Sequence, residues 1–326
     1  MNNKNIPEVS VCIPTYYHEK YISQAINSVL EQKVSFKYEI IVSDDCSKDN
    51  TQSIIMDYSK KIKNIKYFFH KENIGLTNNL FFARSKCSGK YIMCLSGDDY
   101  WIDKYKMQKQ YEFLEKNRDY VAVSTRICVR KDTDINNNMC LPDIKCCNKR
   151  ITFDMFLKGS SFPRHGMMIR NPFLNTKFKK DYALMPKLSR YIDDYGETFL
   201  ILKNGDAYIL DDVTYVYRKI TKKDNSNNFN SINTYLSIFS KYIEVINNID
   251  KYCNGKYDLT NLYKSSMQTG IIAIIFNHDI SSFKRIYLTI PKKYRKRNLI
   301  IYGLYSLTRF AFNRISLKIK HLFIIE

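Results

Sequence analysis

The stretch GKYIMCLSGDDYW, residues 89–101, joins an apolar run to a turn that carries two adjacent carboxylates. Its apolar part, Tyr91–Leu95, predicts a short buried strand, and Asp98 and Asp99 follow the end of that strand. Open α/β sheets bind their ligands in the crevice beyond the carboxyl ends of the strands. Carboxylate oxygens also suit a Mg²⁺ or Mn²⁺ ion that must hold substrate phosphates. The stretch therefore predicts a metal site at a sheet edge, with an Asp-rich surface turn as the alternative, because Gly and Asp favour turns.

Strands and helices alternate along the chain on both sides of this stretch. Apolar patterns predict strands over residues 8–13, 38–43, 65–69 and 91–95, with helices over 19–32, 49–61, 75–87 and 103–116. This order predicts right-handed βαβ crossovers and hence an α/β fold, a Rossmann-like, mainly parallel sheet flanked by helices. Since polar turns follow the first, second and fourth strands, we expect these turns to face one crevice. No GxGxxG motif follows a strand, which argues against a dinucleotide-dependent dehydrogenase.

The second half of the chain continues the sheet and then changes character. We expect strands over residues 120–129, 207–210 and 213–217, a polar loop or insertion over 130–150, and a helix over 191–204. The Asn- and Lys-rich stretch 221–230 indicates a linker, and apolar patterns beyond it predict further helices. We therefore expect one domain over residues 1–220 and a helical, basic C-terminal region over residues 221–326.

The chain is strongly basic. It has 52 Lys and Arg against 32 Asp and Glu, a net charge of +20, and residues 281–326 hold eleven basic residues and one acid. Such a balance favours an anionic partner, which can be a nucleotide, a nucleic acid or an anionic membrane surface. A nucleic-acid-binding protein is therefore one alternative. We expect no nucleic-acid partner, however, because no RNP-like or helix-turn-helix signature occurs and the charge is concentrated outside the predicted α/β unit.

Cysteine use and hydropathy indicate the compartment. The nine cysteines are scattered, and no pair of CxxC units has the spacing of a zinc site. Met1–Asn5 lead into the first strand without an apolar signal region, and no run of eighteen apolar residues occurs. We therefore expect a cytoplasmic protein with reduced thiols and no membrane span.

Five blocks, in order along residues 8–218, resemble the motifs of family 2 glycosyltransferases, which are enzymes of the GT-A fold. The blocks are VSVCIPTYYHEKYISQAINSVLEQ, YEIIVSDDCSKDNT, ENIG, GKYIMCLSGDDYWIDKYKMQKQ, and DDYGETFLILKNG followed by VYRK. The resemblance implies transfer of a sugar, usually with inversion, from a nucleotide-diphosphate sugar and with the help of a divalent cation. It also implies a nucleotide-sugar half over about residues 1–118 and an acceptor half over about residues 119–220.

The resemblance also implies a biological setting. Relatives that carry GDDYW imply the synthesis of bacterial surface polysaccharide or lipooligosaccharide. The expected activity is hexosyl or N-acetylhexosaminyl transfer to a hydroxyl of a glycan or lipid-linked acceptor. The alternative enzyme class is another nucleotide-binding transferase, such as a nucleotidyltransferase. That class requires a Gly-rich phosphate loop after the first strand, and Pro14–Tyr17 is not such a loop.

The resemblance assigns the metal and the diphosphate to the turn after the fourth predicted strand. The family's DxD metal motif falls on Ser96–Asp98, so Ser96 stands where the first acid of the motif is expected. Asp98 is then the expected ligand of Mg²⁺ or Mn²⁺, and Asp99 is a second ligand or a contact of the ribose or donor sugar. Mg²⁺ keeps several waters and takes few protein ligands, so one missing carboxylate is tolerable. Gly97 shares this turn, and Trp101 is expected either to stack on a sugar ring or only to pack.

The resemblance places the nucleotide on the turns after the first two strands. In relatives the first turn holds the base and ribose, and the matching residues here are Pro14, Thr15, Tyr16 and Glu19. The second acid after the second strand contacts the base in relatives, which makes Asp45, beside Asp44, the candidate. A carboxylate can accept the imide N–H of uracil, so a UDP-sugar is the expected donor. The alternative for both acids is capping of the following helix.

An inverting transfer needs a base that takes the proton of the acceptor hydroxyl as it attacks. The family's Glu-Asp pair falls on Asp193 and Asp194, so Asp194 is the expected base and Asp193 its neighbour or an acceptor contact. Adjacent carboxylates can raise each other's pKa, which favours a base. The alternative is that acids in the first helical turn complement the helix dipole.

Three weaker features complete the prediction. Arg218 is expected to bind the diphosphate or only to end a surface strand, and His165 either lines the acceptor pocket or is a polar turn residue. The Arg that many relatives carry after Asn-x-Gly is missing from Leu76–Asn79. The basic tail is either a solvated helical face or an amphipathic surface for anionic lipid. In the second case the enzyme would lie at the inner face of the cytoplasmic membrane, near a lipid-linked acceptor.

Overall fold

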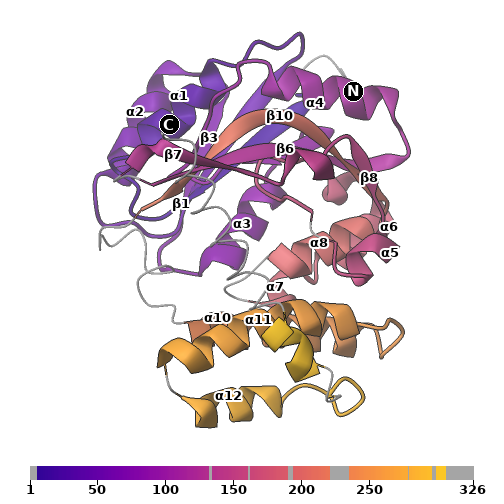
Figure 1. Cartoon of the computed structure of the whole chain (residues 1–326). Helices are drawn as coiled ribbons and strands as arrows, with labels where there is room; N and C mark the ends of the chain where they lie inside the picture. Colours follow the sequence, from indigo (N-terminus) through magenta and orange to yellow (C-terminus); the bar gives the residue numbers. More distant parts are fainter. Residues whose placement is uncertain are drawn as a thin grey trace, which may run out of the picture. The chain divides into compact units, whose positions relative to one another are not determined.

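The computed structural model describes residues 6–131, 134–160, 162–189, 194–220, 235–277, 279–295 and 299–305. The chain forms two compact units: unit 1 combines residues 1–156 and 160–228, and unit 2 combines residues 157–159 and 229–326. Unit 1 carries the β-sheet, and unit 2 is helical (Figure 1). The predicted linker, residues 221–230, lies outside the described residues.

Unit 1 is built on a ten-stranded sheet with the order β3-β2-β1-β4-β9-β6-β10-β5, in which β7 also pairs with β6 and β8 with β10. Strands β1 to β4 are parallel, as are β6 and β10, while β5, β7, β8 and β9 pair antiparallel. The predicted α/β class with a mostly parallel sheet is confirmed. The strands are β1 (Val9–Thr15), β2 (Tyr38–Asp44), β3 (Ile65–Phe69), β4 (Tyr91–Cys94), β5 (Tyr100–Trp101), β6 (Tyr120–Lys131), β7 (Asp134–Leu141), β8 (Lys149–Ile151), β9 (Met168–Arg170) and β10 (Asp206–Lys219).

Helices cover both faces of this sheet. One hydrophobic core lies between the strands and three helices, α1 (Ile22–Leu30), α2 (Thr51–Lys61) and α4 (Lys106–Lys116). Figure 1 shows α3 (Leu76–Ser85) on the other side of the strands. Shorter helices follow in the second half of the unit: α5 (Phe153–Leu157), α6 (Thr176–Tyr182), α7 (Met185–Leu188) and α8 (Asp194–Leu202), with 3-10 turns at Ile144–Cys146 and Pro172–Leu174.

The first strands and helices form because their apolar residues have the period that each structure needs. All seven residues of β1 are buried, as expected for a central parallel strand that is covered on both faces. In α1 the buried side chains include Ile22, Ala25, Ile26 and Val29, which share one face of a helix. Because β1, β2 and β4 are parallel, their carboxyl ends, and the turns that follow them, lie at one edge of the sheet.

Two parts of unit 1 differ from the prediction. The polar stretch expected as a loop over residues 130–150 contains β7, which pairs antiparallel with β6. A strand of this kind is held by main-chain hydrogen bonds, so its Asn-rich sequence gives no apolar signal. The two short strands expected over 207–210 and 213–217 are one strand, β10, whose register with β6 shifts between Ile209 and Val213. The irregularity takes up Asp211 and Asp212, the residues that made the sequence resemble a turn.

Within the residues of unit 2 that the structure describes lie α10 (Tyr235–Tyr252), α11 (Thr260–Asn277), α12 (Ile280–Tyr287) and a helical segment at 299–305, so the expected C-terminal helices are present. Its core includes Phe239 of α10, Met267 of α11 and Phe283 of α12. A Cβ on Gly270 would lie 2.9 Å from Phe283 and 3.0 Å from Phe239, so glycine permits the close approach of these helices. Among the described residues, none of the helices is long and apolar enough to cross a membrane.

Candidate active site

The turns after β1, β2 and β4 are joined by main-chain hydrogen bonds at the end of β1. Gly97 N donates to Pro14 O, and Asp45 N donates to Thr15 O, each at 3.0 Å. Thr15 and Asp45 are buried, with only 2% and 3% of their surface exposed. The structure thus brings the expected nucleotide residues of the first two turns next to the expected metal turn.

Gly97 allows the closest approach between two of these turns. A Cβ at this position would lie 2.6 Å from Thr15 Oγ1 and 2.7 Å from His18 Nδ1, which are distances that no real Cβ tolerates. The side chains of Thr15 and His18 therefore pack directly on the backbone of the turn Gly97–Asp99, called the GDD turn below. Glycine is needed here for space, because any larger residue would push these side chains away from the turn.

Asp98 is the partly exposed acid of the GDD turn. Its Oδ1 accepts a hydrogen bond from Ser96 Oγ at 2.5 Å, and its Oδ2 lies 3.9 Å from His18 Nε2. The Asp98 side chain is 17% exposed, while that of His18 is 9% exposed. Asp98 therefore offers a carboxylate at the sheet edge, next to an imidazole that the sequence prediction did not include.

Asp99 has a different environment from its neighbour. It is 1% exposed, its Oδ2 accepts from the Tyr215 hydroxyl at 2.6 Å, and its Oδ1 accepts from Arg218 N at 2.7 Å. Burial, reinforced by the charge of Asp98, raises the pKa of the Asp99 carboxyl well above its ordinary value. Both oxygens are engaged in fastening β10 to the turn. Of the two expected metal ligands, the geometry therefore favours Asp98.

The acids after β2 also make hydrogen bonds within the protein. Asp44 accepts from Ser47 N at 2.8 Å and from Gln52 Nε2 at 2.7 Å, and so fixes the start of α2. Asp45 accepts from the main-chain N–H groups of Ile74 and Gly75 at 2.7 and 3.0 Å, and burial raises the pKa of its carboxyl. Among the described residues, Asp44 accepts from no main-chain N–H of α2, whose N-cap is Asn50, so it orders the turn between β2 and α2 without capping the helix. The contacts of Asp45 leave lone pairs on its carboxylate for a further donor.

Glu19 and Tyr16 complete the first turn. Glu19 Oε2 accepts from Asn50 N at 3.0 Å and from Asn50 Nδ2 at 3.1 Å, which ties the first turn to the second. The partly buried ring of Tyr16 packs edge-on against Tyr17, with 4.6 Å between the ring centroids. Tyr16 therefore keeps part of its ring accessible at the sheet edge, as a contact of a base or ribose requires.

Trp101 belongs to β5, and Arg218 belongs to β10, the strand that pairs with β5. Trp101 is 4% exposed and belongs to the hydrophobic core, so its ring is not available for a sugar to stack on, and the packing alternative is the one that the structure supports. The Arg218 guanidinium lies 4.6 Å from the centroid of the Tyr21 ring and 5.1 Å from that of Tyr100. Its Nη2 also donates to Gln24 Oε1 at 2.6 Å. Arg218 is thus a partly exposed cation beside Asp99, held between two aromatic rings.

The expected base lies at the start of α8. Asp193 lies outside the described residues, and α8 begins at Asp194, whose side chain also lies outside them. One turn further along the helix, Glu197 is fully buried and forms ion pairs with Arg84 of α3 and with Arg164, the latter at 2.8 Å. Its Oε1 also accepts from the Tyr182 hydroxyl at 2.7 Å. This buried group fixes the helix that begins with Asp194.

Two more polar side chains lie near the sheet: Lys106, which is not among the predicted site residues, and His165, which is a weak candidate. Lys106 is fully buried, and its Nζ donates to Gly166 O at 2.6 Å, Thr214 Oγ1 at 2.9 Å and Thr125 Oγ1 at 3.1 Å. Burial lowers the pKa of this amine to about 7. His165 packs against the rings of Tyr215 and Tyr217, with centroids 6.0 and 5.1 Å away.

The GDD turn offers few protein ligands for a divalent cation. Within the part of the chain that the structure describes, no group of three or more His, Cys, Asp or Glu could hold a metal ion. An ion at this turn would take one carboxylate from Asp98 and complete its shell with other groups. Mg²⁺ and Mn²⁺ bind in this way in phosphate-handling sites, through one or two carboxylates plus substrate phosphates and water. The residues present fit such an ion.

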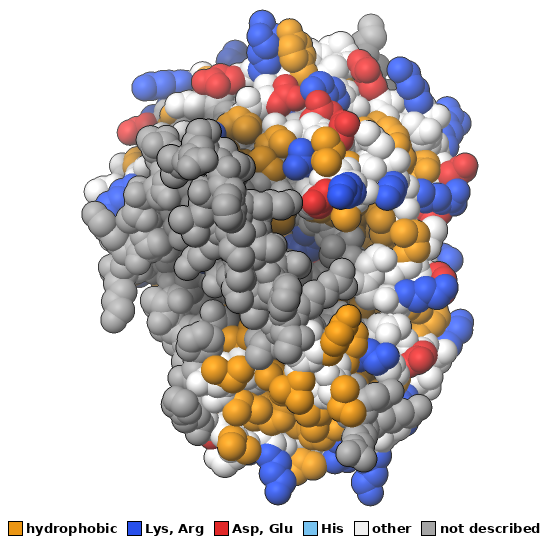
Figure 2. Space-filling view, in the orientation of Figure 1, with side chains coloured by type: hydrophobic (Ala, Val, Ile, Leu, Met, Phe, Trp, Pro, Cys, Tyr) orange, Lys and Arg blue, Asp and Glu red, His pale blue; other side chains and the backbone are white. Residues whose placement is uncertain are grey.

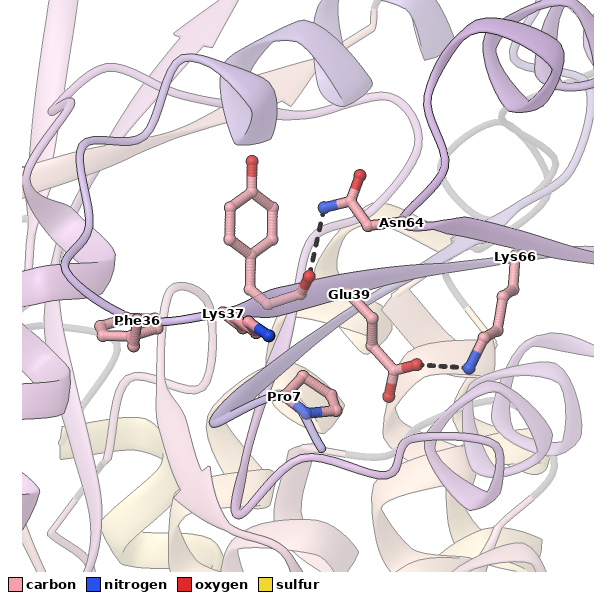
Figure 3. Close-up of a pocket in the computed structure, with 7 residues that line it drawn as sticks. Pro7, Phe36, Lys37, Glu39, Asn64 and Lys66 are labelled. Atoms are coloured by element: carbon pink, nitrogen blue, oxygen red, sulfur yellow. Dashed lines mark hydrogen bonds and ion pairs between the residues drawn. The ribbon is translucent and has the colours of Figure 1, made fainter. Parts of the chain in front are cut away.

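A cavity of about 450 Å³ lies elsewhere, at the opposite ends of the strands. It is lined by Pro7, Phe36, Lys37, Tyr38, Glu39, Asn64 and Lys66. Figure 3 shows Glu39 and Lys66 pointing toward each other, and they form an ion pair of 2.8 Å. Tyr38 and Lys66 lie in the first residues of β2 and β3, so this cavity is at the amino edge of the sheet. Ligands of open α/β sheets bind at the other edge.

Comparisons with known proteins agree with this architecture. The family model described as "Glycosyl transferase family 2" matches residues 10–176. TuaG of Bacillus subtilis (strain 168), a protein named for teichuronic acid biosynthesis, is 28% identical over 223 residues, which cover 68% of this chain and 82% of TuaG. The glycosyltransferase EpsE of the same strain is 34% identical over 140 residues, which cover 42% of this chain and 49% of EpsE.

Solved structures share the fold. The crystal structure of S. aureus TarS 1–349 in complex with UDP-GlcNAc superposes with a TM-score of 0.58 at 19% identity, over 92% of this chain and 80% of that one. The mannosyltransferase PcManGT from Pyrobaculum calidifontis, in complex with GDP-Man and Mn²⁺, superposes with a TM-score of 0.53 at 15% identity, over 94% of this chain and 88% of that one. The expected GT-A fold is therefore confirmed.

Proposed function

The chain belongs to glycosyltransferase family 2, and from this premise we propose that it transfers a sugar from a UDP-sugar, with inversion at the anomeric carbon, to a hydroxyl of a surface glycan. One observation carries the proposal. Main-chain hydrogen bonds from Gly97 and Asp45 to the end of β1 bring three turns together at the carboxyl edge of the sheet, where Asp98 is partly exposed. Groups suited to a base, a diphosphate and a divalent cation therefore lie side by side.

We assign the nucleotide to the first two turns. Pro14, Thr15 and Tyr16 would hold the ribose and base, and the Asp45 carboxylate would accept the N–H of the base while it keeps its bonds to the next turn. An imide N–H is present in uracil, which favours a uridine nucleotide. The TarS structures with UDP and with UDP-GlcNAc support a UDP-sugar, whereas the PcManGT structure with GDP-Man makes a GDP-sugar the alternative.

We assign the diphosphate to Arg218 and to a divalent cation that Asp98 would hold. A bound divalent cation would supply the positive charge that makes a nucleoside diphosphate a better leaving group. Asp98 is the carboxylate that would hold it, since Asp99 is engaged by Tyr215 and by the main chain of Arg218. The Arg218 guanidinium would neutralise the oxygens of the departing diphosphate from the other side of the turn, because a planar guanidinium suits phosphate oxygens.

We assign the base to Asp194 and a supporting contact to Asp193. The assignment is supported by the family's Glu-Asp pair, which falls on these residues, and by the buried contacts of Glu197 that hold α8 in place. The Asp194 carboxylate would accept the proton of the acceptor hydroxyl while the hydroxyl oxygen attacks the anomeric carbon. The bond between the anomeric carbon and the diphosphate oxygen breaks as the new bond forms, the nucleoside diphosphate leaves with the bonding electrons, and the proton stays on Asp194 until it is lost to water.

The acceptor is proposed from the relatives. TuaG is named for teichuronic acid biosynthesis, and EpsE is a second glycosyltransferase of the same organism. A hexose or N-acetylhexosamine transferred to a surface polysaccharide, lipooligosaccharide or lipid-linked glycan agrees with these names.

The donor is tested by thermal unfolding of the full chain with a panel of nucleotide-sugars and Mn²⁺. A UDP-sugar at one hundred times its Kd should stabilise the protein by about 2.7 kcal/mol and raise its Tm. GDP-sugars should leave the Tm unchanged. If no nucleotide-sugar moves the Tm, the proposed function fails, and if only GDP-sugars do, the assignment of the donor fails.

Variants separate the two acids. Asp98→Asn should abolish turnover and remove the extra stabilisation that Mn²⁺ gives to the complex with UDP. Asp194→Asn should abolish turnover and leave the donor's Kd unchanged, because the base acts on the acceptor. Asp57→Asn, an exposed acid paired with Lys60, is the control and should change neither. An active Asp194→Asn enzyme would remove that residue as the base.

We further propose that unit 2 docks on an anionic lipid surface, at the inner face of the cytoplasmic membrane. Figure 2 shows hydrophobic side chains gathered over the helices of this unit. Large apolar side chains that are at least 40% exposed are Ile275, Ile280, Leu288, Ile301, Tyr302, Leu304 and Tyr305. Lys284, Arg285, Lys292 and Lys293 lie in the same stretch of chain. Apolar and basic side chains together suit the interface of an anionic bilayer.

Flotation with vesicles that contain 30% phosphatidylserine tests this surface. Changing Ile301, Leu304 and Tyr305 together to Ser should reduce the recovery of the protein in the lipid fraction severalfold. Leu174→Ser, a change to an apolar residue of unit 1 that is 66% exposed, is the control. Equal recovery of the triple variant and the wild type would end the proposal, and so would binding to neutral vesicles as strong as to anionic ones.

A further inference from the structure

Position 96 is where this chain departs from its family's metal motif, because Ser96 stands in place of the first acid. The structure shows what the serine does instead. Its hydroxyl donates to Asp98 Oδ1 at 2.5 Å, so that oxygen is occupied and the other, Oδ2, is turned toward His18. The loss of an acid in the GDD turn is therefore accompanied by an imidazole that approaches the remaining acid from the turn after β1.

The His18 ring is held in one orientation by its surroundings. Its Nδ1 lies 3.0 Å from Thr15 Oγ1, and a Cβ on Gly97 would come within 2.7 Å of the same nitrogen. Its main-chain N–H donates to Thr51 Oγ1 at 2.9 Å, and the residue is 7% exposed. When Nδ1–H donates to Thr15, the lone pair of Nε2 faces Asp98. Histidines that bind metals have this arrangement, in which the second ring nitrogen donates to a fixed oxygen.

We propose that His18 Nε2 is the second protein ligand of the divalent cation held by Asp98, in place of the acid missing at position 96. The proposal rests on the proposed function, since that function brings a cation to this turn. His18 Nε2 and Asp98 Oδ2 are 3.9 Å apart. Neighbouring ligands of an octahedral ion with bonds of about 2.1 Å lie about 3 Å apart, so the two atoms must approach by about 1 Å. A small rotation of the partly exposed Asp98 side chain is enough for such a shift.

The ligand set has a consequence for the choice of metal. Imidazole nitrogen suits transition metals, while Mg²⁺ prefers oxygen ligands. A site with one carboxylate and one imidazole should therefore prefer Mn²⁺ to Mg²⁺ more strongly than a site with two carboxylates. Restoring the acid with Ser96→Asp should reduce this preference.

Electron spin-echo spectroscopy of Mn²⁺ tests the proposal directly on the full chain with UDP. A histidine ligand gives the bound Mn²⁺ a ¹⁴N coupling, and wild type should show it. His18→Gln, which keeps the size of the side chain and an oxygen donor, should lose the coupling and weaken Mn²⁺ binding about tenfold or more. His70→Gln, which alters a histidine next to Ser43, is the control and should keep both the coupling and the affinity.

The outcomes separate the inference from the function on which it rests. If wild type binds UDP and Mn²⁺ without a ¹⁴N coupling, His18 is not a ligand, and the proposed function stands. A coupling that persists in His18→Gln would also overturn the inference. If neither UDP nor Mn²⁺ binds, both proposals fail together. The coupling in wild type is independent of how well the variants fold, so its absence there overturns the inference whatever the variants do.

Discussion

Two regions of unit 1 hold functional side chains in place by different means. The donor edge, formed by the turns at residues 14–19, 44–51 and 96–101, is joined by main-chain hydrogen bonds to the end of β1. The α8 anchor, formed by Glu197 with Arg84, Arg164 and Tyr182, is joined by buried side-chain charges. The donor edge combines these main-chain bonds with side-chain ones, such as those of Glu19 and Asp45, whereas the α8 anchor depends entirely on four particular side chains.

This difference teaches where each region is vulnerable. At the donor edge the main-chain hydrogen bonds survive most substitutions, so a loss of space should disturb it more than the loss of one partly exposed side chain. At the α8 anchor the removal of one carboxylate leaves buried charges without their partner, which is among the costliest changes in a protein interior. The predictions below test this contrast, from the largest expected effect to the smallest.

Glu197→Ala should give the largest loss of stability. The change leaves the Arg84 guanidinium, which is 2% exposed, without the carboxylate it faces, and such a loss costs about 3–5 kcal/mol. Urea unfolding followed by circular dichroism measures the free energy of unfolding. Asp57→Ala is the control, because the Asp57 side chain is 61% exposed and pairs with the exposed Lys60, so its loss should lower the free energy of unfolding far less. Equal losses for the two variants would contradict the idea of an α8 anchor.

Gly97→Ala should give the largest loss of stability of any single change at the donor edge. Its Cβ would lie 2.6 Å from Thr15 Oγ1, so Thr15 and the turn must move apart, at a cost of about 1–3 kcal/mol. Because Thr15 and Asp98 would shift together, the Kd for the donor should also rise about tenfold or more, as measured by calorimetry. Ser96→Ala, in the same turn, adds no atoms and removes one part-buried hydrogen bond to Asp98, so it should cost about 0.5–1.5 kcal/mol without moving Thr15. A Gly97→Ala protein with native stability and affinity would show that the turn adapts.

Lys106 uses both kinds of contact, because its buried amine donates to a main-chain carbonyl and to two side-chain hydroxyls. The pH dependence of the free energy of unfolding tests this arrangement. The pKa of Lys106 is lowered to about 7 by burial, while an unfolded chain loses this proton only near pH 10.4. Between these values the unfolded chain binds more protons, so the contribution of Lys106 to the free energy of unfolding rises with pH. Urea unfolding at pH 7, 8 and 9 should therefore show that wild type gains stability relative to Lys106→Met. A difference that does not change with pH would mean that the amine keeps its proton.

Arg218→Lys should have the smallest effect and should appear in binding rather than in stability. Lysine keeps the charge but loses the planar group that lies between the rings of Tyr21 and Tyr100. We expect the KM for the donor to rise about fivefold, because an ammonium group lacks the planar fork that can bind two phosphate oxygens at once, and the free energy of unfolding to change little. Arg150→Lys, at an exposed ion pair, is the control. A large loss of stability in Arg218→Lys would place Arg218 among the structural residues.

The donor edge could be predicted from the sequence to a large extent. Strands β1, β2 and β4 are largely apolar, and the polar turns that follow them, with paired acids after β2 and β4, mark the sheet edge. The sequence could not show that Asp98 and Asp99 have different environments. That difference depends on Tyr215 of β10, which lies 116 residues beyond Asp99 and contacts that carboxylate.

His18 and the α8 anchor could not be read from the sequence. A single histidine in a turn gives no pattern, and its approach to Asp98 depends on the space that Gly97 leaves. Glu197 occupies a helix position where an acid normally faces water, while its partners lie in α3, in a loop and in α6. A charged residue inside the apolar pattern of a helix, such as Arg84 in α3, was the one available signal of a buried pair.

The hydrogen bonds that join Gly97 to Pro14 and Asp45 to Thr15 also bear on the thermodynamics of donor binding. Loops that become ordered only when a ligand arrives lose conformational entropy, and that loss subtracts from the affinity. Here the turns are tied to a buried strand before the donor arrives. The protein should therefore lose little conformational entropy when the donor binds. Substitutions of side chains at the donor edge should change the specificity for the nucleotide more than changes in the length of the turns.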